Sequence, residues 1–568
     1  MKIKNVEVHN YRAIKRLKVN FNDYGLIVGA NNAGKSTLIN SLRAFYEKEG
    51  FKFSKDRDFP KMGGLEDNES WIDIEFDLDD DEFESLMDDY KWKDNVLKVR
   101  KYFLTSQKGD NNKTMAGSIF GYTDEETLSG SPFYGAKNVG SGKFGNLIYI
   151  PAISRVEDHT RLTGPSHLRE LLDNLLKDVV EDSETFSKFS GNFENLSSEL
   201  KNDTTDDGRS LLGFEHEINS HLKEWGAEFK LDIRPPSTAD IIKNLVSHNL
   251  FESGSEEPQG AGQFGSGFQR HFIFSLIQVG AKLEVKKTKK DTKEFSPAMD
   301  LILFEEPEAF LHPPQQDILA SRLMELAKRE NRQIICTSHS SHFVSRNMQE
   351  LTSIVRLSKK TGEIKSFQID QKRFEEISKG NEKLLSILRE HSKNSEEETE
   401  FNLATNSFNL YLFLDSERSS LFFANFILLV EGPSERSLVS KLIYDKKIDP
   451  KDIELKVLDT FGKYNTHRFI ELLNELGIPH AVLIDSDENK NIHKDLNELI
   501  SNCENQQCTK KVTFLEKDLE SFLEVKTKST HGNKAQHLMY LYSKDEISSD
   551  KLTEFGEVIE KVLPSSTS

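Results

Sequence analysis

The chain has 568 residues, of which 36% are hydrophobic and 30% charged, and its formal net charge is −19. Since domains usually hold about 100–200 residues, we expect two to four of them. The acidic balance argues against a generally basic nucleic-acid-binding protein, although it is compatible with a local basic groove. No run of about 18 apolar residues occurs, and the N-terminus lacks an apolar core of signal-peptide length. With only three cysteines, the sequence predicts a cytoplasmic protein with no membrane contact.

Apolar patterns in the first two thirds of the chain predict an α/β domain. Strands within residues 1–30 lead to a helix over 35–46, and further strands alternate through 70–105. Apolar residues at three- and four-residue steps then predict a helical insertion at about 158–250. Strand–helix alternation resumes afterwards, so we assign this first domain to residues 1–390, and we expect the insertion to serve in dimerisation.

A second α/β pattern follows a polar, acidic stretch. Residues 391–400 are rich in Ser, Asn and Glu, which predicts a linker or hinge over 391–422. The apolar run Phe426–Val430 opens the next strand–helix alternation. The second domain is therefore expected to span residues 423–568.

A phosphate-binding loop stands at the end of the first apolar strands. Gly29-Ala-Asn-Asn-Ala-Gly34-Lys35-Ser36 fits the pattern G-x-x-x-x-G-K-[ST] between a strand and a helix. In this pattern the backbone N–H groups surround phosphate oxygens, the lysine reaches the β- and γ-phosphates, and the serine ligates Mg²⁺. We therefore expect ATP with Mg²⁺ here. The predicted nucleotide-binding residues of the loop are Gly29, Asn31, Asn32, Gly34, Lys35, Ser36 and Thr37.

Polar residues at the ends of two later strands complete a site for nucleotide hydrolysis. Glu305 and Glu306 follow the apolar run 301–304, where Glu305 would hold Mg²⁺ and Glu306 would polarise the attacking water. Two adjacent acids at the end of an apolar strand have no simple structural explanation. His339 follows the apolar run 334–336, a position from which it can sense the γ-phosphate, although a lone histidine is more often structural.

The last element of this site is the segment Gly265-Ser-Gly-Phe-Gln-Arg270, in which Ser266, Gly267 and Gln269 precede a helix that can cap a second γ-phosphate. These four elements, in this order, resemble the ABC-type ATPase heads of the SMC/RecF/Rad50 group. In such heads this signature loop acts across a dimer interface, so the resemblance implies a homodimer or higher homo-oligomer. The chain departs from the group at Glu305, where Asp is usual, and in lacking Leu-Ser-Gly-Gly-Gln. Both departures concern the rate of hydrolysis more than nucleotide binding.

A carboxylate cluster is predicted in the second domain. Glu431 follows the apolar run Phe426–Val430, and Glu435 lies one helical turn further on. Asp485 and Asp487 follow the apolar run 481–484. Hard oxygen ligands of this kind suit Mg²⁺ or Mn²⁺, and four converging acids would repel one another without cations between them.

The Glu-Gly plus Asp-x-Asp pattern resembles the Toprim domain of topoisomerases, primases and related nucleases, and Glu435 points to the nuclease branch. There two metal ions can clamp the attacking water and the leaving oxygen. An ABC-type head with a helical insertion, followed by a Toprim domain, resembles the OLD (overcoming lysogenization defect) family of nucleases. The resemblance implies that the metal ligands are Glu431, Glu435, Asp485, Asp487 and, for a second metal, Glu520. It also implies that Lys534 is the catalytic lysine.

We therefore expect an ATP-hydrolysing, Mg²⁺- or Mn²⁺-dependent DNA endonuclease or nickase. The resemblance implies a role in anti-phage defence, alone or beside a helicase or a retron reverse transcriptase with its nucleic acid. The expected catalytic residues are Glu306, His339, Glu431, Asp485 and Lys534. One alternative stays open: an SMC/RecF-like nucleotide-gated DNA-binding ATPase whose Toprim domain is a non-cleaving assembly module. A transporter would need membrane spans, a topoisomerase a tyrosine on a DNA-gate domain, and a primase a zinc-binding module.

Overall fold

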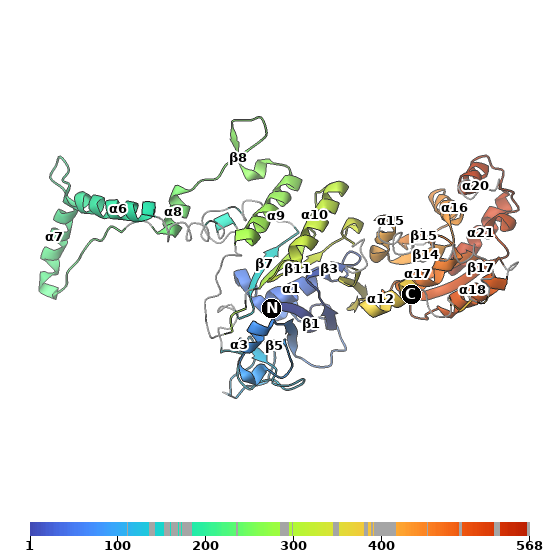
Figure 1. Ribbon diagram of the computed structural model, residues 1–568, viewed down its shortest axis with the longest axis horizontal. Coiled ribbons are helices and arrows are strands. Elements are labelled where there is room, and N and C mark those ends of the chain that lie inside the picture. Colours follow the sequence, from blue (N-terminus) through green and yellow to red (C-terminus); the bar gives the residue numbers. More distant parts are fainter. Residues whose placement is uncertain are drawn as a thin grey trace. The chain divides into compact units, whose positions relative to one another are not determined.

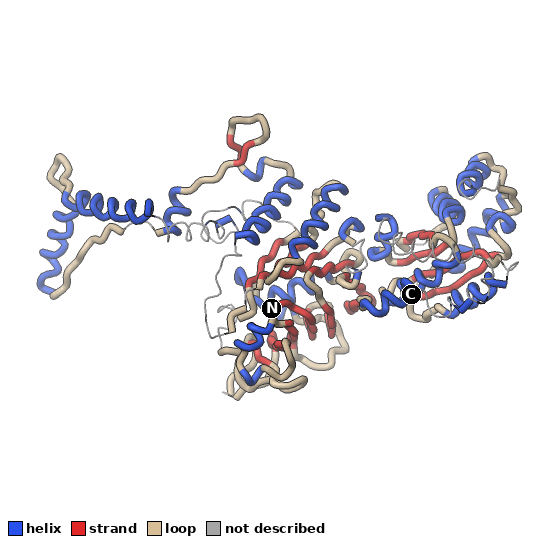
Figure 2. The backbone as a smooth tube through the Cα atoms, in the orientation of Figure 1, coloured by secondary structure: helices blue, strands red, loops and turns tan. Residues whose placement is uncertain are grey.

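The computed structural model describes residues 1–152, 184–283, 295–344, 351–379, 416–487, 491–527 and 534–564, apart from short gaps at 111, 136–142, 235–236, 298 and 451–452, with a few isolated residues between these ranges. The chain divides into two compact units. The first unit combines Met1–Ala152 with Thr292–Ser568, and the second holds Ile153–Asp291. Figures 1 and 2 show the helices and strands of both.

The chain begins with a five-stranded antiparallel sheet in the order β2-β1-β4-β5-β6. Alternating apolar residues of its long strands face one core, as the strand period of two requires. Its strands are β1 (Lys2–Tyr11), β2 (Ile14–Asn20), β4 (Ser70–Asp77), β5 (Val96–Leu104) and β6 (Ile119–Gly121). The short helices α2 (Lys55–Asp58) and α3 (Asp80–Ser85) lie in the connections.

A six-stranded sheet in the order β13-β12-β3-β11-β10-β7 carries the nucleotide motifs. All its neighbouring strands are parallel except the β12–β13 hairpin. Its strands are β3 (Tyr24–Val28), β7 (Asn146–Ile150), β10 (Asp300–Glu305), β11 (Arg332–Thr337), β12 (Ile354–Lys360) and β13 (Glu363–Phe367). The helices that accompany it are α1 (Lys35–Tyr46), α10 (Pro313–Ala327) and α12 (Gln371–Lys379). Because β3, β10 and β11 are adjacent and parallel, the loops after them meet at one edge of the sheet.

A four-stranded parallel sheet in the order β15-β14-β16-β17 forms the C-terminal part. Its strands are β14 (Phe426–Val430), β15 (Leu455–Asp459), β16 (His480–Asp485) and β17 (Thr509–Leu515). One face, with Leu428, Val430 and Leu483, packs in a single core with helices α16 (Pro433–Tyr444), α20 (Lys534–Ser543) and α21 (Ser549–Val562). The remaining helices are α15 (Ser416–Ser419), α17 (Lys463–Glu475), α18 (Asn491–Asn502) and α19 (Leu519–Phe522). Near-continuous apolar strands are what a parallel sheet between helices requires.

The second unit is mainly helical among its described residues, as the helical insertion predicted at about 158–250 requires. Its helices are α6 (Glu184–Asn202), α7 (Leu211–Leu222), α8 (Thr238–Leu245) and α9 (Ser266–Leu283), with a two-residue hairpin of β8 (Leu250–Phe251) and β9 (Pro258–Gln259). Much of the predicted helical pattern before residue 184 lies outside the described residues.

The predicted α/β fold class is confirmed by these sheets, and the strands expected from apolar runs occur as β3, β10, β11, β14 and β16. The predicted linker falls mostly on 391–415, which lies outside the described residues, so the domain boundaries stay predictions. Among the described residues, no helix combines the length and apolarity that crossing a membrane requires.

Candidate functional site

The phosphate-binding loop connects β3 to α1. Gly29 has φ +147° and Gly34 has φ +102°, a left-handed backbone region that favours glycine. A Cβ on Gly29 would lie 2.3 Å from the carbonyl oxygen of Leu357, and one on Gly34 would lie 2.2 Å from Ile364. The β12–β13 hairpin therefore packs against the loop closely enough to require glycine at both positions.

Lys35 is held in the loop by two backbone carbonyls. Its Nζ donates to the oxygen of Gly29 at 2.9 Å and of Ala30 at 3.0 Å. Burial lowers the pKa of Lys35 to about 8, partly offset by the charges of Glu306 and Glu308. Because carbonyls are weak counter-charges for a buried ammonium, a phosphate anion is a better partner for this side chain.

The predicted hydrolytic residues gather after β10 and β11. Burial raises the pKa of Glu305, while the charge of Arg43 and the nearby hydroxyl of Ser36 act against this shift. The Nε2 of His339 lies 3.6 Å from Oε1 of Glu306. Both Glu306 and Asn32 adopt positive φ angles, of +45° and +62°. The Mg²⁺-ligating pair predicted by the sequence is thus adjacent, and the predicted base lies beside the predicted γ-phosphate sensor.

Glu308 also belongs to this site, although the sequence alone does not predict a role for it. Its buried Oε1 accepts hydrogen bonds from the backbone N–H of His339 at 2.7 Å and from the hydroxyl of Ser338 at 2.9 Å. It therefore fixes the turn that presents His339. The sequence does show Glu308 as a third acid within four residues. It does not show that Glu308 accepts hydrogen bonds from Ser338 and His339.

The signature residues lie in the second unit, at the start of α9. Ser266 is the first residue of this helix, and the side-chain amide of Gln269 donates to the backbone oxygen of Phe264 at 2.7 Å. Ser266 is exposed, and Gly267 and Gln269 are half-buried. The predicted helix after this loop is confirmed.

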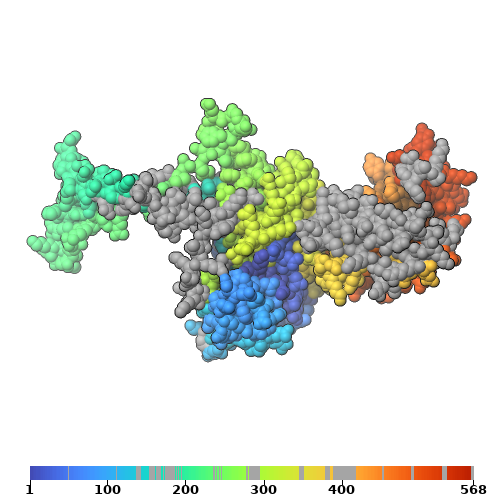
Figure 3. Space-filling view, in the orientation of Figure 1, coloured from blue at the N-terminus to red at the C-terminus, as the bar shows by residue number. Residues whose placement is uncertain are grey.

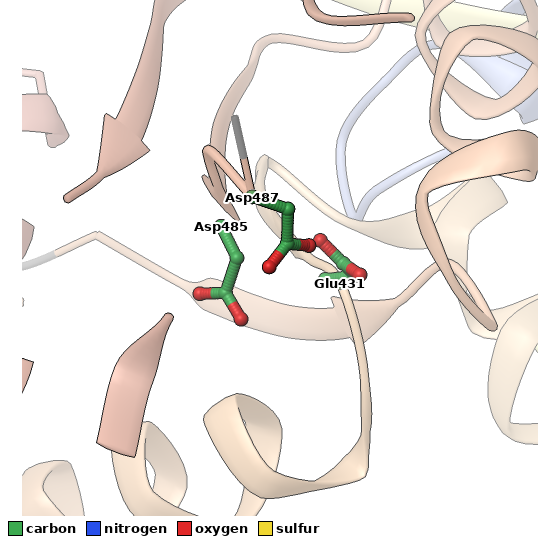
Figure 4. Close-up of side chains that lie close together, drawn as sticks. All are labelled: Glu431, Asp485 and Asp487. Carbon is green, nitrogen blue, oxygen red and sulfur yellow. The ribbon is translucent and has the colours of Figure 1, made fainter. Parts of the chain in front are cut away.

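The second predicted site lies at the carboxyl ends of β14 and β16. Glu431 follows β14, Asp485 is the last residue of β16, and Asp487 lies two residues on with φ +46°. One carboxylate oxygen from each of these three residues lies within 4.8 Å of the others. Figure 4 shows the three side chains, with the carboxylates of Glu431 and Asp487 pointing toward each other. The adjacent parallel strands explain how residues 54 positions apart meet.

Electrostatics in this cluster favour a cation. Burial, with the charges of Glu435, Glu431 and Asp487, raises the pKa of Asp485 to about 9. Burial raises the pKa of Glu431 to about 7, against the opposing charge of Lys463. Oε2 of Glu431 and Oδ1 of Asp485 are buried and have no hydrogen-bond partner among the described residues. Buried acceptors without donors, lined by acids, fit a hard divalent metal ion.

Glu435, Glu520 and Lys534 extend the cluster on the other side of Asp485. Glu435 is buried on the first turn of α16, and its Oε2 accepts from the backbone N–H of Gly432 at 2.9 Å. Lys534 begins α20, and its Nζ lies 2.7 Å from Oε2 of Glu520. The charges of Glu520 and Lys534 act on Glu435, and that of Lys534 acts on Asp485. Glu431, Glu435 and Asp487 therefore lie near Asp485, and Glu520 lies near Glu435 and Lys534.

The structure also places Lys463 in this site, a position that the sequence alone does not establish. It begins α17, is only 2% exposed, and its Nζ lies 3.2 Å from both Oδ2 of Asp487 and the backbone oxygen of Ser486. The N–H of Gly462 donates to the backbone oxygen of Glu431 at 2.8 Å. The turn before α17 thus ties together the segments that carry Glu431 and Asp487.

Comparison with protein families matches both parts of the chain. A family described as "AAA ATPase domain" matches residues 1–118 and 82–344. A family described as "Overcoming lysogenization defect protein-like, TOPRIM domain" matches residues 422–487, which include Glu431, Glu435, Asp485 and Asp487. A family of unknown function matches residues 269–436.

Curated relatives extend over most of the chain. The Old nuclease of Escherichia phage P2 is 24% identical over 521 residues, or 89% of this chain and 81% of that protein. The endonuclease GajA of Bacillus cereus (strain VD045) is 23% identical over 96% of this chain and 86% of that protein. The OLD nuclease of Thermus scotoductus is 22% identical over 85% of this chain and 82% of that protein. The chain belongs to the OLD (overcoming lysogenization defect) family, with an ATPase domain followed by a Toprim domain.

Proposed function

We propose that this chain is an ATP-hydrolysing, divalent-metal-dependent enzyme that cuts or nicks DNA, and that it serves in anti-phage defence. The observation that carries the proposal is the cluster of Glu431, Asp485 and Asp487, with Asp485 buried, on a chain that also holds a phosphate-binding loop. The names of the relatives, Old nuclease and endonuclease GajA, assign nuclease activity to those proteins.

The proposed metals are Mg²⁺ or Mn²⁺. Glu431, Asp485 and Asp487 would hold one ion, and Glu435 and Glu520 would contribute to a second beside Asp485. Bound in this way, such ions supply an activated water and neutralise the leaving oxygen of a phosphodiester. The cluster is acidic and repels phosphate, so a phosphate can approach it only where a nearby positive charge offsets this repulsion.

Lys534 supplies positive charge from this chain. Its ammonium pairs with Glu520 and favours the ionised form of Asp485. A phosphodiester placed against the cluster would meet this ammonium, which would stabilise the charge that develops on the phosphate during cleavage. We propose this as the catalytic role of Lys534.

In the ATPase domain, Lys35 and Ser36 would bind the nucleotide phosphates and Mg²⁺, together with Glu305. Glu306 would orient and deprotonate the attacking water, and His339 would contact the γ-phosphate. Glu308 would position His339 through its backbone. The hydroxyl of Ser36 lies close enough to Glu305 to lower the pKa of its carboxyl, which supports their joint role at the metal.

We further propose that Ser266, Gly267 and Gln269 contact nucleotide bound to a second subunit, so that two ATPase domains engage as a homodimer or higher oligomer. Ser266 is exposed at the start of an 18-residue helix, as such a contact requires. Sedimentation with a non-hydrolysable ATP analogue tests this, since Ser266→Arg should block nucleotide-dependent association. A second defence protein as partner stays a prediction.

The nuclease assignment is tested with supercoiled plasmid. Wild-type protein should nick or linearise it in Mg²⁺ or Mn²⁺. Asp485→Asn should lower the rate by at least about 100-fold, because it removes the carboxylate that lies between the ligands proposed for the two metal ions. Glu498→Gln, an exposed position on α18, is the matched control and should cut normally. Equal cutting by wild type and Asp485→Asn would refute the assignment. No cutting by wild type under any metal would favour a nucleotide-gated DNA-binding ATPase.

A further inference from the structure

Helices α16 and α20 both start at the carboxylate cluster and run side by side away from it. Glu435 lies on the first turn of α16, and Lys534 is the first residue of α20. The two helices are in contact with each other. At their other ends, the hydroxyl of Tyr542 donates to Oδ2 of Asp445, just after α16, at 2.7 Å. The helices therefore run in the same direction, and their exposed sides offer a path that leads away from the cluster.

Two aromatic rings stand out on this path. Tyr444, the last residue of α16, is 81% exposed, and Tyr540 on α20 is 54% exposed. The apolar side chains of α20 that build the core, Leu538 and Leu541, point elsewhere and are buried. The ring of His537 is stacked with that of Tyr540, with centroids 6.4 Å apart and planes 10° apart. These rings thus present flat faces and edges to solvent without serving the core.

Positive charge accompanies the rings. The Nζ of Lys441 lies 5.0 Å from the centroid of the Tyr444 ring, and that of Lys544 lies 5.9 Å from the centroid of Tyr540. Lys446 and Lys447 are exposed just after α16. The two helices together hold a single acid, Glu435, which is buried. Asp445, directly after α16, forms an ion pair with Lys441 at 2.6 Å, so the positive charge of this surface comes mainly from Lys446, Lys447 and Lys544. Figure 3 shows atoms of this region, in orange and red, at the molecular surface.

Exposed rings interleaved with lysines suit an unpaired nucleic-acid strand. Aromatic faces stack on bases that are not already paired, while ammonium groups meet the phosphates. From Lys534 to Tyr540 is about 9 Å along the helix, or about three stacked nucleotides. A duplex has its bases stacked internally, so it would meet only the lysines. The surface therefore favours single-stranded over double-stranded DNA.

We propose that the α16–α20 surface binds an unpaired DNA strand next to the cleavage site, with Tyr444 and Tyr540 as stacking platforms. The inference rests on the proposed nuclease function and adds a substrate class to it: DNA with a single-stranded segment beside the scissile phosphate. Acids resume after α20, at Asp545 and Glu546, which limits the path to the length of the two helices.

Binding without cleavage tests this directly. Full-length protein is titrated, with chelator present so that no cutting occurs, into a fluorescein-labelled oligo-dT of about 20 nucleotides and into a duplex of the same length. Tyr444→Ala/Tyr540→Ala should weaken oligo-dT binding by at least about tenfold and duplex binding by about twofold or less. Tyr444→Phe/Tyr540→Phe keeps the rings and should bind oligo-dT like wild type.

A matched control lies in the second unit. Trp225 and Phe251 are 82% and 56% exposed, so Trp225→Ala/Phe251→Ala removes similar exposed rings and should leave oligo-dT affinity unchanged. Unchanged oligo-dT affinity in the tyrosine-to-alanine variant, or an equal loss in the phenylalanine variant, overturns the proposal. Plasmid cutting by the wild type is scored separately. If the wild type cuts plasmid but the alanine variant keeps its oligo-dT affinity, the proposed DNA-binding surface is refuted and the nuclease function is not. If oligo-dT binding depends on the rings but the wild type cuts no plasmid, the nuclease function is refuted.

Discussion

At the scale of single residues, the two sites share one electrostatic feature: ionisable groups that are buried without a partner of opposite charge. Lys35 is held by backbone carbonyls, and Asp485 by acids of its own sign. Such arrangements cost free energy in the absence of ligand, and they are relieved when an ion of opposite charge binds. We therefore expect both sites to be stabilised by their ligands, the first by phosphate and the second by divalent metal.

The pKa of Asp485 makes the stability of the metal-free protein depend on pH. The folded chain keeps this proton up to about pH 9, whereas the unfolded chain releases it near pH 4. Folding therefore takes up a proton between these values, and stability falls as pH rises through them. Thermal unfolding with chelator should show wild type losing several degrees relative to Asp485→Asn between about pH 5 and pH 8. Parallel pH profiles of the two proteins would contradict this assignment.

Lys463 should act as an internal counter-ion for Asp487 and Glu431. Lys463→Met keeps the volume of the side chain but removes its charge, which should cost about 1–2 kcal/mol, since Asp487 is 34% exposed and partly screened. Added Mn²⁺ should recover most of this loss, because it supplies the missing charge. The readout is the rise in melting temperature on adding Mn²⁺. It should be larger than in wild type or in Lys510→Met, an exposed control on β17. An equal rise in all three would count against the role.

At the scale of elements, the strands that carry the sites were predictable and many partners were not. Continuous apolar runs gave β3, β10, β11, β14 and β16, because a parallel sheet between helices buries both faces of each strand. The acids that follow these strands were also predictable, because each apolar run marks where its strand ends. The role of Lys463 could not be predicted from the sequence, because its partner Asp487 is brought to it by the fold. The α16–α20 surface also requires the fold, since it combines residues about 100 positions apart.

The β12–β13 hairpin packs against the phosphate-binding loop and restricts its conformation. Gly29→Ala would combine a φ of +147° with a Cβ 2.3 Å from the oxygen of Leu357, so the loop must shift. Gly362→Ala in the hairpin turn has φ +87° but nothing within 4 Å, so it carries only the conformational cost of about 1–2 kcal/mol. ATP affinity, measured by calorimetry, should fall at least about tenfold in Gly29→Ala and stay near wild type in Gly362→Ala. Equal ATP affinities in the two variants would show that the hairpin does not determine the conformation of the loop.

At the scale of the whole molecule, one buried arginine joins the ATPase sheet to the Toprim sheet within the first unit. Arg356 of β12 is 3% exposed and donates to the backbone oxygens of Leu476, at 2.9 Å, and of Gly477, at the C-terminal end of α17. The opposite end of α17 carries Lys463, beside Asp487. Because β12 also contacts the phosphate-binding loop at Gly29, a single helix connects the surroundings of both sites. This arrangement favours a nuclease whose rate responds to nucleotide.

The response of cutting to nucleotide is the most direct measurement of this account. Plasmid cleavage in Mg²⁺ is timed for wild type and Lys35→Ala, each with and without ATP. We expect ATP to change the wild-type rate by about tenfold or more, and we expect Lys35→Ala to cut at one rate in both conditions because the lysine that binds the phosphates is gone. Metal-dependent cutting that is indifferent to ATP in the wild type, or equally sensitive to ATP in Lys35→Ala, would contradict it.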